Sequence, residues 1–317
     1  MGMFDKIFGG EKHSVDRFVG GTKKGRKEVG KQLDRRFRDQ ERFEAIKPYE
    51  REKTPAEKEA IRLANEATDA LREKYGLPAY EVPEKNIHIV RDVPESRKEL
   101  GKEGVHGKFN EMAQVIISLE RSTRTQTLHG IFHEMAHFKS FTSMVVDEEE
   151  KTIAGRRMGL TTRDNENRTA FMPLNEAVTE ELTKRFIRAQ EDDHADDHDI
   201  KNLRTARKKY PSEDTEDIYS VTVEGKTESG GVKLDFNGFG YRVERKALGI
   251  LIDKLKERNP KTFRDKEEWF DMFASAMFNG HLLEIARSIE GTFGKGKFRE
   301  LGEQKTGEEL LKFVESL

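Results

Sequence analysis

Apolar side chains recurring every three or four residues predict several amphipathic helices along the chain. The clearest begins at Thr54-Pro55-Ala56-Glu57, where threonine can cap the helix, proline suits the first helical position and glutamate the third. Small and apolar side chains follow at helical spacing until Gly76 ends the pattern. Further helices are predicted over 124–141, from about 174 into the acidic run at 191–199, and over 241–257, 265–279, 282–289 and 306–316.

Shorter apolar runs predict strands between these helices. Single strands are expected at 87–91 and 113–119, an inserted β-hairpin at 144–172, and a second hairpin at 219–236. The strand just before the helix at 124–141 is expected to form an edge on which an extended substrate pairs, although it also fits an ordinary sheet strand. Together these elements predict an α+β fold with a small mixed sheet, two central helices and a helical C-terminal subdomain.

The first 53 residues differ in composition from the rest of the chain. They are rich in Lys, Arg and acids and poor in aliphatic residues, which predicts a charged, mobile N-terminal arm with one fragile helix over about 29–46. Its apolar residues Met3, Phe4, Ile7 and Phe8 could dock on the body or on a protein partner, or belong to a frayed terminus. The remainder divides into a core over 54–200, with the inserted hairpin at 144–172, and a connector, hairpin and helices over 201–317.

Composition and charge narrow the class of protein. Of 317 residues, 37% are charged, the net charge is −2 and none is cysteine. Disulfides and thiolate ligands are therefore excluded, and nucleic acid is not an expected partner, so the basic residues of the arm are interpreted as a solvated face. No apolar run approaches the roughly 18–20 residues of a membrane span, and the N-terminus lacks a signal-peptide pattern. A cytoplasmic location is expected.

The candidate chemistry begins with the pattern His-Glu-x-x-His at 133–137. Residues four apart share one face of a helix, so His133 and His137 can hold the same metal ion, typically zinc. Glu134 would then face a water on that ion. Two incidental histidines on a buried helix are the alternative. His129 lies on the same stripe but is too far along the helix to be a ligand, so we expect it beside the site.

A catalytic zinc keeps about three protein ligands and one open position, so a third ligand is needed. The run Asn-Glu-Ala-Val-Thr-Glu at 175–180 places Glu176 and Glu180 on one helix face. One of them can bind the metal while the other accepts a hydrogen bond from a ligand histidine. A solvent-facing acidic pair is the alternative. The acidic run at 191–199 also carries ligand-type residues, but a solvated loop is favoured because nothing there fixes a geometry.

The two helix motifs together resemble the gluzincin metallopeptidases, the thermolysin-like clan. The resemblance covers about 85–190, and the spacer between the motifs is longer than in thermolysin. It implies a zincin-like fold with Zn²⁺ as cofactor. It also implies that Glu176 is the third zinc ligand, that Glu180 supports a ligand histidine, most simply His133, and that Asn175 is a supporting neighbour of the ligand.

The resemblance also implies hydrolysis of peptide bonds in a peptide or protein substrate. Zinc lowers the pKa of its water to about 7, and Glu134 takes the proton as general base. The oxyanion needs a further donor, which gluzincins take from a downstream Tyr, His or Arg. Tyr241 is preferred here, with Tyr219 and His281 as competitors. Two other functions stay open: a regulatory zincin-like protein that cuts or only binds one partner, and a protein with a structural or inactive metal site.

Overall fold

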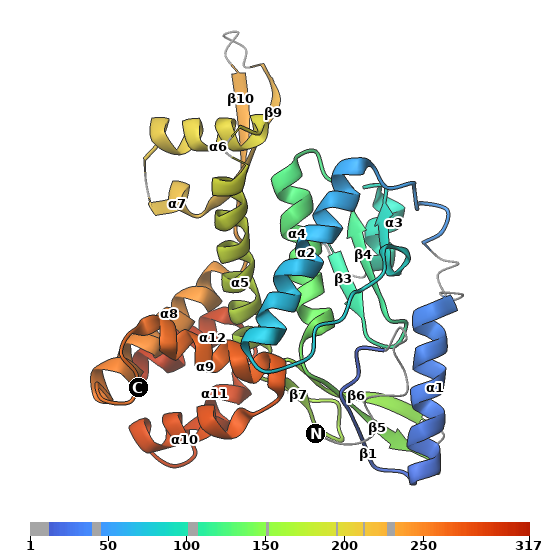
Figure 1. Ribbon diagram of the computed structural model, residues 1–317. Coiled ribbons are helices and arrows are strands. Elements are labelled where there is room, and N and C mark those ends of the chain that lie inside the picture. Colours follow the sequence, from blue (N-terminus) through green and yellow to red (C-terminus); the bar gives the residue numbers. More distant parts are fainter. Residues whose placement is uncertain are drawn as a thin grey trace.

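The three sheets of the described chain are small, and helices surround them in a mixed α+β arrangement (Figure 1). The computed structural model describes residues 13–39, 46–100, 107–149, 152–194, 196–211, 213–226 and 232–317. The N-terminal apolar residues Met3, Phe4, Ile7 and Phe8, for which docking and a frayed terminus were both open, lie outside these ranges. Within the described residues, no helix has the length and apolar character needed to cross a membrane.

The first sheet has the order β2-β4-β3, formed by β2 (Ile87–Val90), β4 (Val115–Leu119) and β3 (Gly107–Asn110). β2 runs parallel to β4, and β3 runs antiparallel to it. The strand before the central helix is therefore the middle strand, and the expectation that it forms an edge is wrong. The edge next to that helix is β3, whose four residues are too few to show an alternating pattern in the sequence.

The second sheet joins the N-terminal segment to the inserted hairpin. Its order is β1-β5-β6-β7-β8, formed by β1 (Arg17–Val19), β5 (Thr142–Asp147), β6 (Thr152–Met158), β7 (Thr161–Arg163) and β8 (Thr169–Ala170). β1 runs parallel to β5, and the other neighbouring strands are antiparallel. The region expected as an inserted hairpin thus forms most of a five-stranded sheet.

Helix α1 (Lys23–Asp39) also belongs to the packed structure. Val29, Leu33 and Phe37 recur every four residues and are buried, the first two in a cluster with Val15 and side chains of β5. The helix begins six residues before the expected position 29. Burial of this apolar stripe stabilises a helix whose glycines and charges predict a fragile one. Part of the segment expected to be a mobile arm is therefore packed on the second sheet.

Two long helices carry the centre of the fold. α2 (Pro55–Lys74) begins with the predicted capping box of Thr54 and Glu57 and packs along α4 (Arg124–Lys139), as Figure 1 shows. α4 begins with a second capping box, of Thr123 and Gln126, and nearly all of its residues are buried. α5 (Met172–Asp193) packs against α4 from the other side. The two motif-bearing helices therefore lie in direct contact.

The remaining elements lie in the second half of the chain and around the first sheet. The hairpin of β9 (Ile218–Lys226) and β10 (Val232–Gly238) projects beside α6 (His198–Lys209), as Figure 1 shows. The C-terminal helices pack against α5 and share one hydrophobic core with α2 and α4. These other helices are η1 (Glu84–Asn86), α3 (Pro94–Leu100), α6 (His198–Lys209), α7 (Glu213–Glu216), α8 (Arg242–Arg258), α9 (Lys266–Asn279), α10 (Leu282–Phe293), α11 (Lys297–Glu303) and α12 (Gly307–Ser316).

Candidate metal centre

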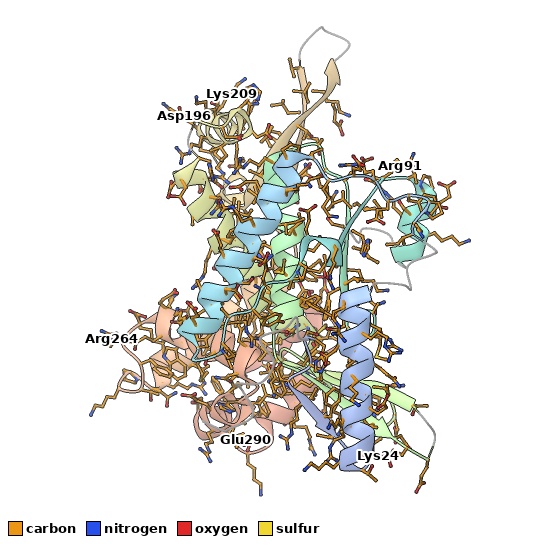
Figure 2. All side chains as sticks on the ribbon, turned by 45° about the vertical axis from the view of Figure 1, so that its right-hand side comes forward. Lys24, Arg91, Asp196, Lys209, Arg264 and Glu290 are labelled. Carbon is orange, nitrogen blue, oxygen red and sulfur yellow. The ribbon has the colours of Figure 1, made fainter. Side chains whose placement is uncertain are left out.

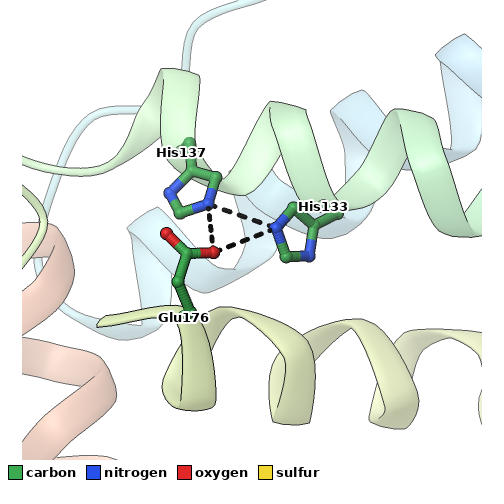
Figure 3. Close-up of side chains that lie close together, drawn as sticks. All are labelled: His133, His137 and Glu176. Carbon is green, nitrogen blue, oxygen red and sulfur yellow. Dashed lines mark hydrogen bonds and ion pairs between the residues drawn. The ribbon is translucent and has the colours of Figure 1, made fainter. Parts of the chain in front are cut away.

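His133, His137 and Glu176 converge between α4 and α5 (Figure 3). The two Nε2 atoms lie 3.2 Å apart. Glu176 Oε2 lies 3.4 Å from His133 Nε2 and 3.3 Å from His137 Nε2. These ligand-type atoms form a nearly equilateral triangle, so the group could hold a metal ion. Glu176, the carboxylate that the resemblance to gluzincins implies, is the one that lies next to both histidines.

The position of each side chain follows from its helix. The two histidines are one turn apart on α4 and are 8% and 5% exposed, because α4 is buried among α2, α5 and the first sheet. Glu176 lies in the first turns of α5. The N-cap of that helix is Phe171, a left-handed residue with φ 62° whose amide donates to the carbonyl of Gly302. The start of α5, and with it Glu176, is therefore anchored to α11.

The Glu180 carboxylate, one turn after Glu176, binds three donors at once. His133 Nδ1 and His129 Nε2 each donate to it at 2.8 Å, and the Gly240 amide donates at 2.6 Å. The side chain is 1% exposed. Because an ionised carboxylate only accepts, Nδ1 of His133 carries a proton, and in the neutral form of the ring the Nε2 lone pair faces the triangle. Glu180 thus sets the tautomer that a metal ligand requires.

Charge at the triangle favours a cation. Burial opposes the ionised form of both Glu176 and Glu180, yet the neighbouring histidines hold the pKa of each carboxyl well below its usual range. Burial likewise opposes the charged form of His133, but hydrogen bonds to Glu176 and Glu180 raise its pKa well above the usual value. Ionised carboxylates that attract a proton to this histidine also attract a metal ion, so the two compete for the same nitrogen.

His137 and His129 have hydrogen-bond surroundings that differ from those of His133. His137 Nδ1 is buried and finds no hydrogen-bond partner among the described residues, so no acceptor there sets the tautomer of this ring as Glu180 does for His133. His129 lies outside the triangle, as expected, and stacks on Tyr219 with ring centroids 4.2 Å apart. Because His129 bonds Glu180 and also stacks on Tyr219, the network reaches the start of β9. His129 therefore positions the carboxylate that orients His133.

Glu134, the expected general base, lies against the edge strand β3. Its Oε2 accepts a hydrogen bond of 2.7 Å from the Phe109 amide. Gly107 faces the same side chain: a Cβ at that position would lie 3.0 Å from Glu134 Cγ. Because this amide donates to Glu134 of α4, it is directed to the outer edge of β3, away from β4. β3 therefore fixes where the Glu134 carboxylate lies.

Tyr241, the preferred oxyanion donor, lies beside the triangle at the N-cap of α8. Its backbone is left-handed, with φ 51° and ψ 39°, which is uncommon for a bulky residue. The ring stacks on His133 with centroids 5.9 Å apart and is 43% exposed. Loss of hydration and the carboxylates of Glu176 and Glu134 raise the pKa of its hydroxyl, and a hydrogen bond to Glu176 adds to this rise. The hydroxyl stays protonated and can donate.

A charged brace holds the turn that presents Tyr241. Asp217 binds Arg245 of α8 and, at 2.8 Å, Lys184 of α5. Arg245 Nε also donates to the Gly240 carbonyl at 3.0 Å, and the Phe239 amide donates to the Asp217 carbonyl at 2.9 Å. Burial opposes ionisation of Asp217, but its cationic partners hold the pKa of this carboxyl below the usual value. The sequence missed this brace because its members come from three separate elements.

The remaining candidates lie further from the triangle. Asn175 Oδ1 accepts from the Leu160 amide at 2.8 Å, so this side chain holds the β6–β7 turn. Tyr219 is 7% exposed and packed on His129, and His281 is exposed at the N-cap of α10. In the acidic run, Glu191 pairs with Arg207. A search of the described residues for metal-ligand clusters found the triangle of His133, His137 and Glu176 and no other.

Comparison of the chain with protein-family models, with curated proteins and with solved structures gave no match. The chemistry of the site is therefore inferred from its own residues and their geometry.

Proposed function

We propose that this protein is a zinc-dependent metallopeptidase of the gluzincin type, with His133, His137 and Glu176 as zinc ligands. The convergence of these three side chains from two helices carries the proposal. If the motif residues were incidental, the fold would not be expected to bring a carboxylate 39 positions after His137 within 3.4 Å of both histidines.

The spacing of the triangle supports zinc. Tetrahedral zinc with bonds of about 2.0–2.1 Å requires ligand atoms about 3.3–3.4 Å apart. The three separations here are 3.2, 3.3 and 3.4 Å. Two imidazoles and one carboxylate, without thiolate, form a donor set that catalytic zinc uses. Structural sites close their coordination with a fourth protein ligand, and the described group supplies three.

The neighbouring side chains supply what hydrolysis of a peptide bond requires. When bound, zinc would lower the pKa of a water ligand to about 7. Glu134 accepts the proton of the attacking water and delivers it to the leaving amine. Tyr241 donates its hydroxyl hydrogen to the carbonyl oxygen as that atom gains negative charge. The raised pKa of Tyr241 supports this role, because the group must be protonated to donate.

The edge strand β3 supports an extended peptide as substrate. An added strand pairs with exposed backbone groups of a sheet edge. Of the described strands, only β4 pairs with β3, and the outer side of β3 carries the Phe109 amide next to Glu134. A substrate paired along β3 would pass beside the proposed base. We therefore propose that the substrate pairs along β3 and not along β4, the strand for which the sequence suggested this role.

Three variants test the proposal against a proteome-derived peptide mixture. Glu134→Gln should keep one zinc per chain by elemental analysis and lose at least about 10³-fold in kcat, because it removes the base and leaves the ligands intact. Tyr241→Phe should lower kcat about 10²-fold with zinc retained. Glu181→Gln, a neighbouring α5 position paired with Arg185, is the matched control and should remain fully active. Full hydrolysis by zinc-loaded Glu134→Gln contradicts the mechanism.

The regulatory alternative keeps the same zinc ligands but hydrolyses one partner or none. One observation favours it: the Glu134 carboxylate is already engaged by the Phe109 amide. In that case the wild-type protein binds zinc and leaves the whole peptide mixture uncut. A single cleaved protein in an intact-proteome digest, absent with Glu134→Gln, would identify a dedicated protease.

A further inference from the structure

The outward face of α1 carries a single row of basic side chains. Lys24, Lys27, Lys31, Arg35 and Arg38 are all exposed and follow one another at intervals of three or four residues. At 3.6 residues per turn they fall within an arc of about 80°, and over 1.5 Å per residue the row is about 21 Å long. The buried stripe of this helix lies on the opposite face. We call these five residues the basic row.

The charge of the basic row is uncompensated. Lys31 approaches Glu28 at 3.9 Å, and both side chains are more than half exposed, so this pair is weak. The other four cations form no ion pair with the described residues. α1 contains eight basic and three acidic residues, a net charge of +5 in a chain of net charge −2. Helix α1 thus carries a local excess of positive charge that the net charge of the whole chain does not show.

We propose that the basic row binds the phosphate backbone of double-stranded nucleic acid without sequence preference. This inference is independent of the metal centre. A duplex carries one phosphate per about 3.4 Å of axis on each strand, so a row about 21 Å long lies within reach of several phosphates. Base recognition is not part of the proposal, because contacts between cationic side chains and phosphates carry no sequence information.

The surroundings of the row favour a duplex over a single strand or a lipid surface. Single strands are bound by stacking their bases on exposed aromatic rings, and no exposed aromatic ring lies on the described part of α1. A bilayer surface would contact a wide area of the protein around α1 and not the basic row alone. At the N-terminal end of α1 that area includes the exposed Glu148, which accepts from the Thr22 amide at 3.0 Å. An acidic side chain there would repel anionic lipids.

The test measures binding of the full chain to a labelled 24-base-pair DNA duplex of arbitrary sequence between 50 and 300 mM salt. For five contacts, the slope of log K against log salt should be about −4.5, since each phosphate contributes about −0.9. Lys27→Gln/Lys31→Gln/Arg35→Gln should reduce the slope to about −1.8 and weaken binding at least about tenfold. Glutamine keeps a helix propensity close to that of Lys and Arg, and circular dichroism checks the fold.

The matched control removes the same charge from α6, with Lys201→Gln/Lys208→Gln/Lys209→Gln. Figure 2 shows that Lys209 lies far from Lys24, the first residue of the basic row. The control should keep the wild-type slope. Equal losses in the two triple variants would overturn the proposal, because net charge would then be the cause. Tighter binding to the single strand of the same sequence, or binding to phosphatidylserine vesicles without binding to the duplex, would also overturn it.

Discussion

At the scale of single residues, Glu180 links the metal centre to the rest of the molecule. Its two oxygens accept from His133, from His129 and from the Gly240 amide, one residue before Tyr241. One buried carboxylate therefore orients a proposed ligand and anchors the turn of the proposed oxyanion donor. Because such supporting groups fix ligand geometry, their loss typically costs 10–100-fold in metal affinity or activity.

Gly107 gives a prediction at the same scale. A Cβ there would lie 3.0 Å from Glu134 Cγ and 3.3 Å from the Ile117 carbonyl, which belongs to the sheet and cannot move easily. Gly107→Ala should therefore displace the Glu134 side chain and lower kcat about tenfold or more while zinc content stays at one per chain. Steady-state kinetics and elemental analysis measure both.

Gly249→Ala is the control for Gly107→Ala, since a Cβ at position 249 meets nothing within 4 Å. It should leave kcat unchanged. Wild-type activity in Gly107→Ala would mean that Glu134 does not act from the position that β3 gives it.

At the scale of elements, α2 holds the C-terminal end of the metal-binding helix. Arg72 donates to the carbonyl of Lys139 at 2.6 Å, at the last turn of α4. The Lys139 ammonium is fully buried and donates to Asp69 at 2.7 Å and to the Asn65 carbonyl at 3.1 Å. Cations at a helix C-terminus interact favourably with its exposed carbonyls. The α2–α4 contact thus fixes the helix that carries both histidines.

The buried Lys139 makes the free energy of unfolding of this protein depend on pH. Burial lowers its pKa to about 8, although Asp69 opposes this, whereas an unfolded lysine titrates near 10.5. Between these values the unfolded chain binds a proton that the folded protein does not, so the free energy of unfolding rises with pH in this window. The rise should be roughly 2–3 kcal/mol. Urea unfolding at pH 7.5 and 10 measures it.

Lys139→Met removes the titrating group and should lose that rise, so the two proteins should differ in the pH slope of their unfolding free energies. Parallel slopes for wild type and variant between pH 8 and 10 would show that Lys139 titrates like an exposed lysine.

At the scale of the whole molecule, the proposed zinc joins two layers of one hydrophobic core. α4 provides two ligands and α5 the third, and the C-terminal helices pack against α5 in the same core as α2 and α4. A ligand that binds only the folded state stabilises it, by about 2.7 kcal/mol at a hundredfold excess over Kd. We therefore expect a chelator to lower the melting temperature by about 5 °C.

Differential scanning fluorimetry of wild type and His137→Ala, with and without chelator, checks this. The variant lacks a ligand, so its melting temperature should be insensitive to the chelator. Equal chelator shifts in both proteins would place the stabilising metal elsewhere.

Much of the fold could be predicted where short-range patterns specify it. The capping box of Thr54 and Glu57, the four-residue spacing of His133 and His137 and the start of the helix after Tyr241 depend on neighbours within one or two turns. The expectation that β4 forms an edge of the first sheet is wrong. Pairing order depends on which strands meet in space, and β3 is too short to be seen in the pattern.

The sequence by itself therefore determined the two helices and the faces on which their polar residues lie, and it offered Glu176 and Glu180 as candidate partners of the two histidines. The tertiary structure decided what each side chain contacts. Only folding brings Gly240 to Glu180, β3 to Glu134 and Asp217 to Arg245. It also places the cations of α1 in one exposed row, which a net charge of −2 conceals. The reason is physical: helical periodicity is a local property of the backbone, whereas these contacts join residues that only the packed core holds together.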